Sequence, residues 1–141
     1  MAAPGLVVID TNVVLDLLLF RDPSTASLSA ALGAGMLRWL ATLPMREELA
    51  RVLVYSKIVA QSQRLGVDPG WLLGQFDHMA QLRPVPMLSS VRCSDPDDQP
   101  FVDLAVVHCA GLLSKDRQLL RLRQRLQAVG VSVRPTLLPA A

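Results

Sequence analysis

The stretch Leu6-Val-Val-Ile-Asp-Thr-Asn-Val-Val-Leu-Asp-Leu-Leu-Leu-Phe20 decides the fold of this chain. Its first four residues are large aliphatic side chains without a polar interruption, which is typical of a strand buried on both faces. Apolar residues then recur at helical spacing, at Val13, Val14, Leu17 and Leu18. The stretch therefore predicts a buried strand that passes directly into a helix, with Asp10 at the junction.

Asp10 is the residue of this stretch that needs an explanation. An ionised carboxylate next to an apolar core is costly unless a positive group or hydrogen bonds compensate it. The surrounding apolar side chains cannot do this. We therefore expect the rest of the chain to supply a partner, or to form with Asp10 a site for a cation.

Strand and helix patterns alternate along the whole sequence. Further strands are predicted at 36–43, 85–93, 111–114 and 131–135. Helices are predicted at 22–35, 44–59, 68–82, 94–110 and 115–130. This alternation favours one α/β domain over residues 1–141, with a central parallel sheet covered by helices on both faces.

The composition excludes several classes of protein. With 51% hydrophobic and 18% charged residues, the chain is expected to be globular and not disordered. No apolar stretch is long enough to span a bilayer, and the first residues lack the pattern of a secretory signal. Cys93 and Cys109 have no metal-type spacing, so free thiols in a cytoplasmic chain are expected, with a disulfide between them as the alternative.

Four acids fall where a parallel sheet binds its ligands, beyond the carboxyl ends of the strands. Asp10 follows the first strand, Asp116 follows the strand at 111–114, and Asp98 opens a helix. Glu48 lies one turn into the helix that begins at Pro44. Carboxylates gathered at one edge cannot all stay ionised without a counter-charge. Because Mg²⁺ and Mn²⁺ prefer oxygen ligands, the pattern predicts a site for one or two such ions.

Each acid also has a structural interpretation. Asp98 could serve only as a helix cap, Asp116 as a turn residue and Glu48 as part of a solvated helix face. Asp98 is preferred over its neighbour Asp97 because it lies closer to the helix N-terminus, where the helix dipole favours a carboxylate. Asp103, further along the same helix, is either an accessory ligand or a solvated position.

These segments together resemble the PIN domain (PilT N-terminus) family over nearly the whole chain. The resemblance rests on "VVIDTNVVLDLLLF", on "LPMREELARVL" and on "SDPDDQPFVDLAVVHCAGLLSKDRQLL", in the family's order and spacing. Within the family it is strongest to the bacterial branch described as toxin components of toxin–antitoxin systems. The resemblance implies a three-layer α/β/α sandwich and metal-dependent cleavage of RNA, or sometimes of structured DNA, by in-line attack of water on a phosphodiester.

The resemblance also implies roles for individual residues. Asp10, Glu48, Asp98 and Asp116 match the four acids that bind metal and carry catalysis. Asn12 and Ser114 match the polar positions that orient those acids, with serine standing where threonine is more usual. A small antitoxin protein is implied as a partner, but no residue identifies it, and self-association into a homo-oligomer is left open. No membrane partner is expected.

Three arginines offer a contact for the substrate. Arg117, Arg121 and Arg125 recur every four residues on the helix predicted at 115–130, directly after Asp116. Such a stripe could contact the RNA backbone without selecting a base sequence, and an ordinary solvated face is the alternative. The remaining notable side chains are assigned to the core: Trp39, Trp71 and Cys109.

Two other functions are compatible with parts of the pattern. A haloacid-dehalogenase-like phosphatase would also place an aspartate after its first strand, but it needs a second acid at the position of Asn12. A PIN-fold module that binds RNA or protein without catalysis would be expected to lack some of the four acids, and all four are present.

Overall fold

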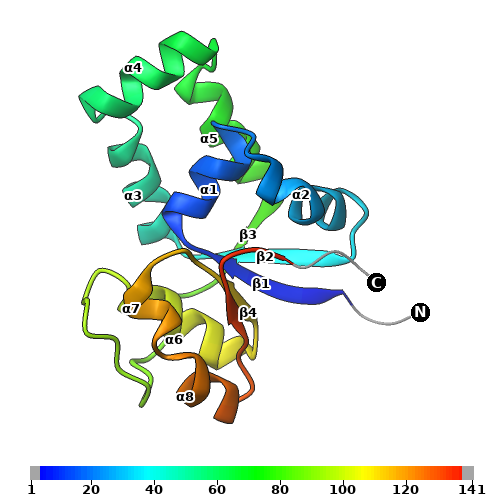
Figure 1. Ribbon diagram of the computed structural model, residues 1–141, viewed down its shortest axis with the longest axis vertical. Coiled ribbons are helices and arrows are strands. Elements are labelled where there is room, and N and C mark those ends of the chain that lie inside the picture. The colour runs from blue at the N-terminus through cyan, green and yellow to red at the C-terminus, as the bar shows by residue number, and fades with distance from the viewer. Residues whose placement is uncertain (1–3, 138–141) are drawn as a thin grey trace.

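A five-stranded sheet runs through the middle of the protein (Figure 1), whose computed structural model describes residues 4–137. All neighbouring strands are parallel, in the order β3-β2-β1-β4-β5. The strands are β1 (Gly5–Ile9), β2 (Leu37–Ala41), β3 (Ala80–Leu82), β4 (Gly111–Leu113) and β5 (Val133–Arg134). The predicted parallel sheet, with its buried first strand, is confirmed.

Helices cover both faces of this sheet (Figure 1). One layer contains α1 (Thr11–Leu18), the 3₁₀ turn η1 (Pro23–Thr25), α2 (Ala26–Gly33), α3 (Leu43–Val52), α4 (Ser56–Leu65) and α5 (Pro69–Met79). The other layer contains α6 (Gln99–His108), α7 (Arg117–Leu120) and α8 (Arg123–Ala128). The α/β/α sandwich implied by the sequence resemblance is therefore the observed fold.

The third strand does not lie where the sequence predicted it. Residues 85–93 contain neither helix nor strand, whereas β3 follows α5 directly and bonds to β2 through the Arg83 N–H and the Ala41 carbonyl, 2.8 Å apart. Pro84 and Pro86 lack the N–H groups that a strand must donate, so they end the pairing after three residues. The segment 83–98 instead connects β3 to α6 without helix or strand and ends in a turn.

Two long helices of the prediction are each divided in two. The helix predicted at 44–59 breaks between α3 and α4, where Tyr55 takes an extended conformation before α4. The helix predicted at 115–130 breaks between α7 and α8, where Leu122 bonds back to Leu119 in a tighter turn. The second break turns both of these leucines into the core. Periodicity alone could not show the breaks because the apolar spacing continues through them.

The core lies on both faces of the sheet and includes Trp39, whose ring meets Phe76 of α5 edge to face at 5.0 Å between centroids. The prediction that Trp71 also belongs to the core is wrong: it is 43% exposed, and the Arg21 guanidinium lies 5.8 Å from its ring centroid. Cys109 is also not a core residue. It is exposed at the end of α6, in the left-handed conformation that closes a helix.

Other predictions from composition can be compared with the structure. Both cysteines are free. Between residues 4 and 137, no helix combines the length and the apolar character needed to cross a bilayer. The segment judged to lack a secretory signal lies partly outside the described residues.

The Trp39–Phe76 contact gives a first test of the fold. Replacing Phe76 by alanine leaves a cavity against Trp39 and should lower the free energy of unfolding by about 3–5 kcal/mol. His78→Ala, at an exposed position of the same helix, should change it by less than about 0.5 kcal/mol. Urea denaturation of both variants measures the difference. Equal effects would contradict the packing of α5 on β2.

Candidate metal centre

The order of the strands reverses its direction between β1 and β4. From β1 the chain proceeds to β2, and from β4 it proceeds to β5 on the opposite side, so the two connections diverge. Parallel sheets bind ligands at such a divergence, beyond the carboxyl ends of the strands. Ile9 pairs with Leu113 across these strands, which places Asp10 and Ser114 side by side immediately after them.

A single buried hydroxyl connects the ends of the two strands. Ser114 is fully buried, and its Oγ donates a hydrogen bond to Asp10 Oδ2 at 2.6 Å. The same Oγ accepts the N–H of Asp116 at 3.0 Å. Ser114 therefore fixes the carboxylate of Asp10 and the backbone of Asp116 at the same point of the sheet edge.

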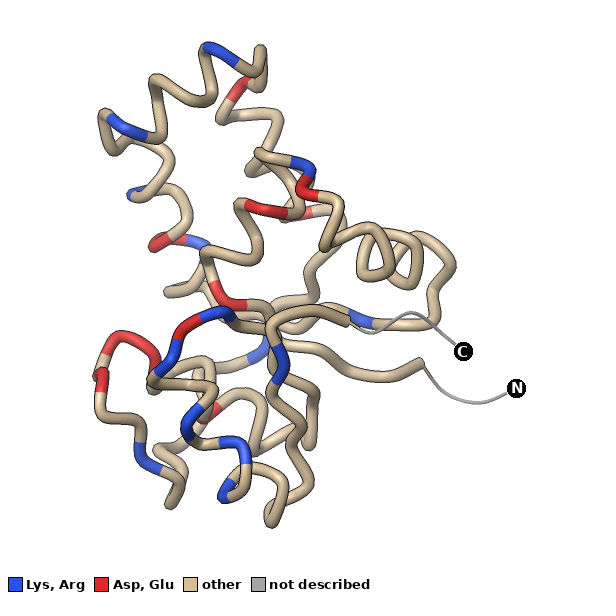
Figure 2. The backbone as a smooth tube through the Cα atoms, viewed as in Figure 1, with Lys and Arg blue, Asp and Glu red and all other residues tan. Residues whose placement is uncertain are grey.

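Three carboxylates converge next to this hydroxyl. Asp95, Asp98 and Asp116 each offer an oxygen, and these oxygens lie within 4.8 Å of one another. Figure 2 shows the acidic loop that precedes α6 lying beside the start of α7. The sequence predicted two members of this group, Asp98 and Asp116, but not Asp95.

Asp95 joins the group through a tight turn. Its Oδ1 accepts the N–H of Asp97 at 2.9 Å, and its carbonyl accepts the N–H of Asp98 at 3.1 Å. These bonds fold the loop so that Asp95 and Asp98 come together. The signal in the sequence was the dipeptide Asp95-Pro96, since an aspartate before a proline favours such a turn.

Asp98 is the least compensated acid of the group. It stands at the N-cap of α6 but makes no capping bond, and it is only 7% exposed. Among the described residues, its buried Oδ2 has no hydrogen-bond partner. Burial, followed by the neighbouring Asp116, raises the pKa of Asp98 to about 7. The helix-cap interpretation of Asp98 therefore does not account for its side chain, which needs a proton or a cation.

Asp10 experiences a similar environment. Burial raises the pKa of Asp10, and the negative charge of Asp116 adds to this effect. The hydroxyl of Ser114 and the backbone at Asn12 oppose it by stabilising the charged form. The hydrogen bond that Asp10 receives at position 12 comes from the backbone of Asn12. The Asn12 side chain, which the sequence resemblance assigned to orienting the acids, is exposed.

Asp116 combines a structural role with membership of the group. Its Oδ1 accepts the N–H of Gln118 at 2.8 Å and caps α7. The preceding residue, Lys115, forms an ion pair with the buried Asp16 of α1 at 2.5 Å. This pair fixes the loop after β4 against α1, and it also explains the second aspartate of the stretch that opens the sequence.

Glu48 lies beside the three-carboxylate group and is not a member of it. It is half-buried on α3 and accepts a hydrogen bond from Thr11 Oγ1 at 3.0 Å. It lines a cavity of about 200 Å³ together with Arg51 and with Pro96 and Asp97 of the acidic loop. Glu48 therefore lies at the border of the site and comes from the helical layer that contains α1 to α5. The neighbouring Glu47 is exposed.

Asp103 lies outside the three-carboxylate group and is buried. Its interpretation as a solvated position is therefore wrong. Asp103 is 8% exposed, and its Oδ1 accepts the Ser89 N–H and the Gln99 Nε2, both at 2.8 Å. Gln99 in turn bonds to the Val91 carbonyl and to the Cys93 N–H. These bonds tie the segment 83–98 to α6 and so hold the acidic loop in place.

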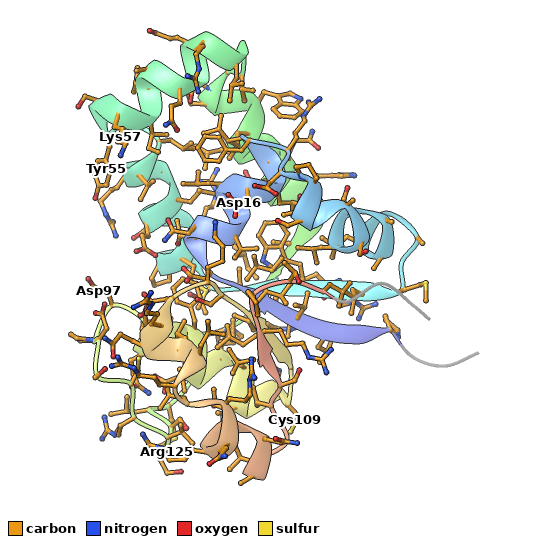
Figure 3. The ribbon with its side chains drawn as sticks, viewed as in Figure 1. Asp16, Tyr55, Lys57, Asp97, Cys109 and Arg125 are labelled. Atoms are coloured by element: carbon orange, nitrogen blue, oxygen red, sulfur yellow. The ribbon has the colours of Figure 1, made fainter. Side chains whose placement is uncertain are left out.

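The three arginines of the predicted stripe are exposed, but the stripe is not continuous. Arg117 belongs to α7, Arg121 lies in the turn that follows and Arg125 belongs to α8. In Figure 3, Arg125 is well separated from Asp97 of the acidic loop. Of the three, only Arg117 is adjacent in sequence to an acid of the group.

The donor set fits a hard divalent cation. The group contains only carboxylate oxygens, which Mg²⁺ and Mn²⁺ prefer. One of its members, Asp98, has a buried oxygen without a partner among the described residues, and burial together with the neighbouring Asp116 raises its pKa. The arrangement can therefore hold a metal ion between α6, α7 and the end of β1.

Comparison with known families agrees with this geometry. A family model described as PIN domain matches residues 6–118, a span that contains all of the acids discussed. The chain belongs to the PIN domain family. Members of this family are generally nucleases that use divalent metals, so the chain has a nuclease-type fold with an acidic group that could bind metal. No curated protein matches the chain significantly.

The pKa of Asp98 predicts how the metal-free protein responds to pH. Because this pKa is raised from 3.8 to about 7 on folding, the folded protein binds more protons than the unfolded chain between these values. The free energy of unfolding should therefore fall as the pH rises through this range. We expect a lower melting temperature at about pH 8 than at about pH 5 in EDTA, and a smaller difference in Asp98→Asn.

The control for this experiment is Asp97→Asn, which removes an exposed charge one position away in the same loop. It should keep the pH dependence of the wild type. Stability that is the same at both pH values in the wild type, or that changes equally in the two variants, would contradict the raised pKa assigned to Asp98.

The bonds made by Asp103 give a separate prediction of stability. Asp103→Ala leaves the partly buried Ser89 N–H and the buried Gln99 amide without their acceptor, which should cost about 1–3 kcal/mol. Hydrogen exchange should also quicken across 89–93, because that segment loses its attachment to α6. Unchanged exchange in this segment would show that Asp103 does not hold the loop.

Proposed function

We propose that this protein is a ribonuclease that hydrolyses phosphodiester bonds with the help of Mg²⁺ or Mn²⁺. The observation that carries the proposal is the buried, unpartnered Asp98 Oδ2 inside a group of three carboxylates at the divergence of β1 and β4. Such an arrangement is unfavourable for folding alone. It is explained if the site serves to bind a cation.

The proposed ligands are Asp10, Asp95, Asp98 and Asp116, with Glu48 as a further acid at the border of the site. When bound, one or two divalent ions would supply a polarised water molecule as nucleophile and offset negative charge on the phosphate. RNA is the proposed substrate because the sequence resemblance to the PIN family implies cleavage of RNA.

The residues around the acids would hold them in position for this reaction. Ser114 fixes the carboxylate of Asp10 by a charge-assisted bond, and the capping bond to Gln118 fixes Asp116. The Lys115–Asp16 pair restrains the loop between them. Because the groups are ordered in advance, little reorganisation is needed when the cation and the phosphate enter.

The biological role proposed here is that of a toxin in the cytoplasm, neutralised by a small antitoxin protein. This proposal is supported by the sequence resemblance to the toxin branch. The exposed arginines Arg117, Arg121 and Arg125 are proposed as contacts for the RNA backbone, with Arg117 closest in sequence to the acids.

A second candidate is a PIN-fold module that binds RNA or protein and has little or no catalytic activity. The position of Glu48 outside the three-carboxylate group favours it, since the fourth acid is then separated from the others. The two candidates differ in one measurable property, cleavage that depends on metal.

Cleavage of single-stranded RNA should require Mg²⁺ or Mn²⁺ and should stop in EDTA. Asp10→Asn should lower the rate by at least about 100-fold, because it removes a charged ligand, while the protein stays folded. Without metal, this variant should be at least as thermostable as the wild type, since one of several repelling charges is gone.

Glu47→Gln is the matched control, because it removes an exposed acid next to the site. It should cleave RNA like the wild type. Undiminished cleavage in EDTA would exclude the metal mechanism, and full activity in a folded Asp10→Asn variant would exclude the role of Asp10. A wild type that binds RNA but never cleaves it would favour the second candidate.

A further inference from the structure

The junction of α3 and α4 carries an unusual set of exposed side chains. Arg51, Tyr55 and Lys57 are all exposed there, and we call these three residues the basic corner. The Tyr55 residue is 57% exposed. From residue 49 to residue 67 the sequence contains three basic residues and no acidic one, although the chain as a whole is nearly balanced in charge.

One residue of the basic corner, Arg51, lines the same cavity as Glu48. Glu48 and Arg51 are three residues apart on α3 and therefore share a face of the helix. Both line the cavity of about 200 Å³ whose opposite wall includes Pro96 and Asp97, from the loop that carries Asp95 and Asp98. A chain that lies in this cavity would contact Arg51 of the basic corner and the loop that carries two of the three carboxylates.

The positions of the labelled side chains agree with such a path. In Figure 3, Tyr55 and Lys57 lie along the same side of the molecule as Asp97, with the α3 segment between them. The basic corner belongs to the helical layer that contains α1 to α5, whereas Arg117 on α7 belongs to the layer of α6 to α8 on the other face of the sheet (Figure 1). Positive groups thus lie on both sides of the acids.

We propose that the basic corner is a binding surface for single-stranded RNA that leads the strand to the carboxylates. Arg51 and Lys57 contact phosphates, and Tyr55 stacks against a base. This inference rests on the proposed function for its substrate class. It assigns the binding of RNA to residues that the sequence patterns did not single out.

Charge is the first argument for this assignment. A site made of carboxylates repels a polyanion, so cations close to it are needed to bring the substrate in. Arginine suits this role because its planar guanidinium matches the geometry of a phosphate. Arg51 is the cation among the residues that line the same cavity as Glu48.

The conformation of Tyr55 is the second argument. Its N–H bonds to the Val52 carbonyl at 3.1 Å, and its own carbonyl accepts the N–H of Val59 at 2.8 Å. The backbone that carries the ring is therefore fixed between the two helices. An exposed aromatic ring carried on an ordered backbone, together with nearby cations, is how proteins hold single strands without selecting a sequence.

The test measures binding of a fluorescein-labelled single-stranded RNA to the full chain in EDTA, over a range of salt concentrations. Tyr55→Ala should weaken binding by about tenfold, the size expected for a lost base stack, and Tyr55→Phe should retain most of the affinity. Arg51→Gln and Lys57→Gln should each flatten the plot of log affinity against log salt by about 0.7.

Arg38→Gln is the charge-matched control. Arg38 is exposed near the start of β2, at the end of the strand away from the acids, and its loss should leave the slope unchanged. Circular dichroism verifies that each variant is folded. Affinities and slopes of the corner variants equal to those of Arg38→Gln would overturn the inference, and the corner would then be examined as a surface for a protein partner.

A cleavage assay with Mn²⁺ separates this inference from the proposed function. If the wild type cleaves RNA, Tyr55→Ala should raise KM with little change in kcat, whereas kinetics unchanged from the wild type would overturn the inference alone. If the wild type does not cleave but the corner variants still lose binding, the proposed function fails and the inference stands.

Discussion

The hydrogen bond between Ser114 and Asp10 is the interaction on which the candidate site depends. It joins the residues that follow β1 and β4 at the point where the connections of the sheet diverge. Because the same hydroxyl accepts the N–H of Asp116, one buried side chain sets the separation of two acids. The sheet, through the pairing of Ile9 with Leu113, provides the rigid frame for that bond.

The acids themselves oppose folding, and the rest of the structure compensates for this. Asp10 and Asp98 have raised pKa values because burial and neighbouring carboxylates disfavour their charge. An apolar core of strands β1, β2 and β4, together with the Asp103–Gln99 bonds, holds the acids together despite their repulsion. Strain of this kind is common at functional sites, where stability is given up for chemistry.

The two helical layers contribute different parts of the proposed mechanism. The layer with α6 and α7 carries the three-carboxylate group, and the layer with α3 and α4 carries Glu48 and the basic corner. The cavity lined by Glu48, Arg51 and Asp97 lies between these layers. A substrate bound along it would contact cations from one layer while its phosphate meets the acids of the other.

The sequence alone determined the features that depend on neighbours in the chain. The buried run before Asp10 and the positions of Asp98 and Asp116 at helix starts follow from local patterns, because strand burial and helix capping are local effects.

Only the tertiary structure decided which acids meet. Asp95 enters the group through a turn, Glu48 stays beside it, and Asp103 bonds to the segment that precedes its own helix. Trp71 and Cys109 likewise looked apolar in sequence, yet both are exposed, Trp71 beside the Arg21 guanidinium and Cys109 at the left-handed end of α6. Such outcomes depend on how the layers pack, and no periodic pattern within one segment records the packing partner.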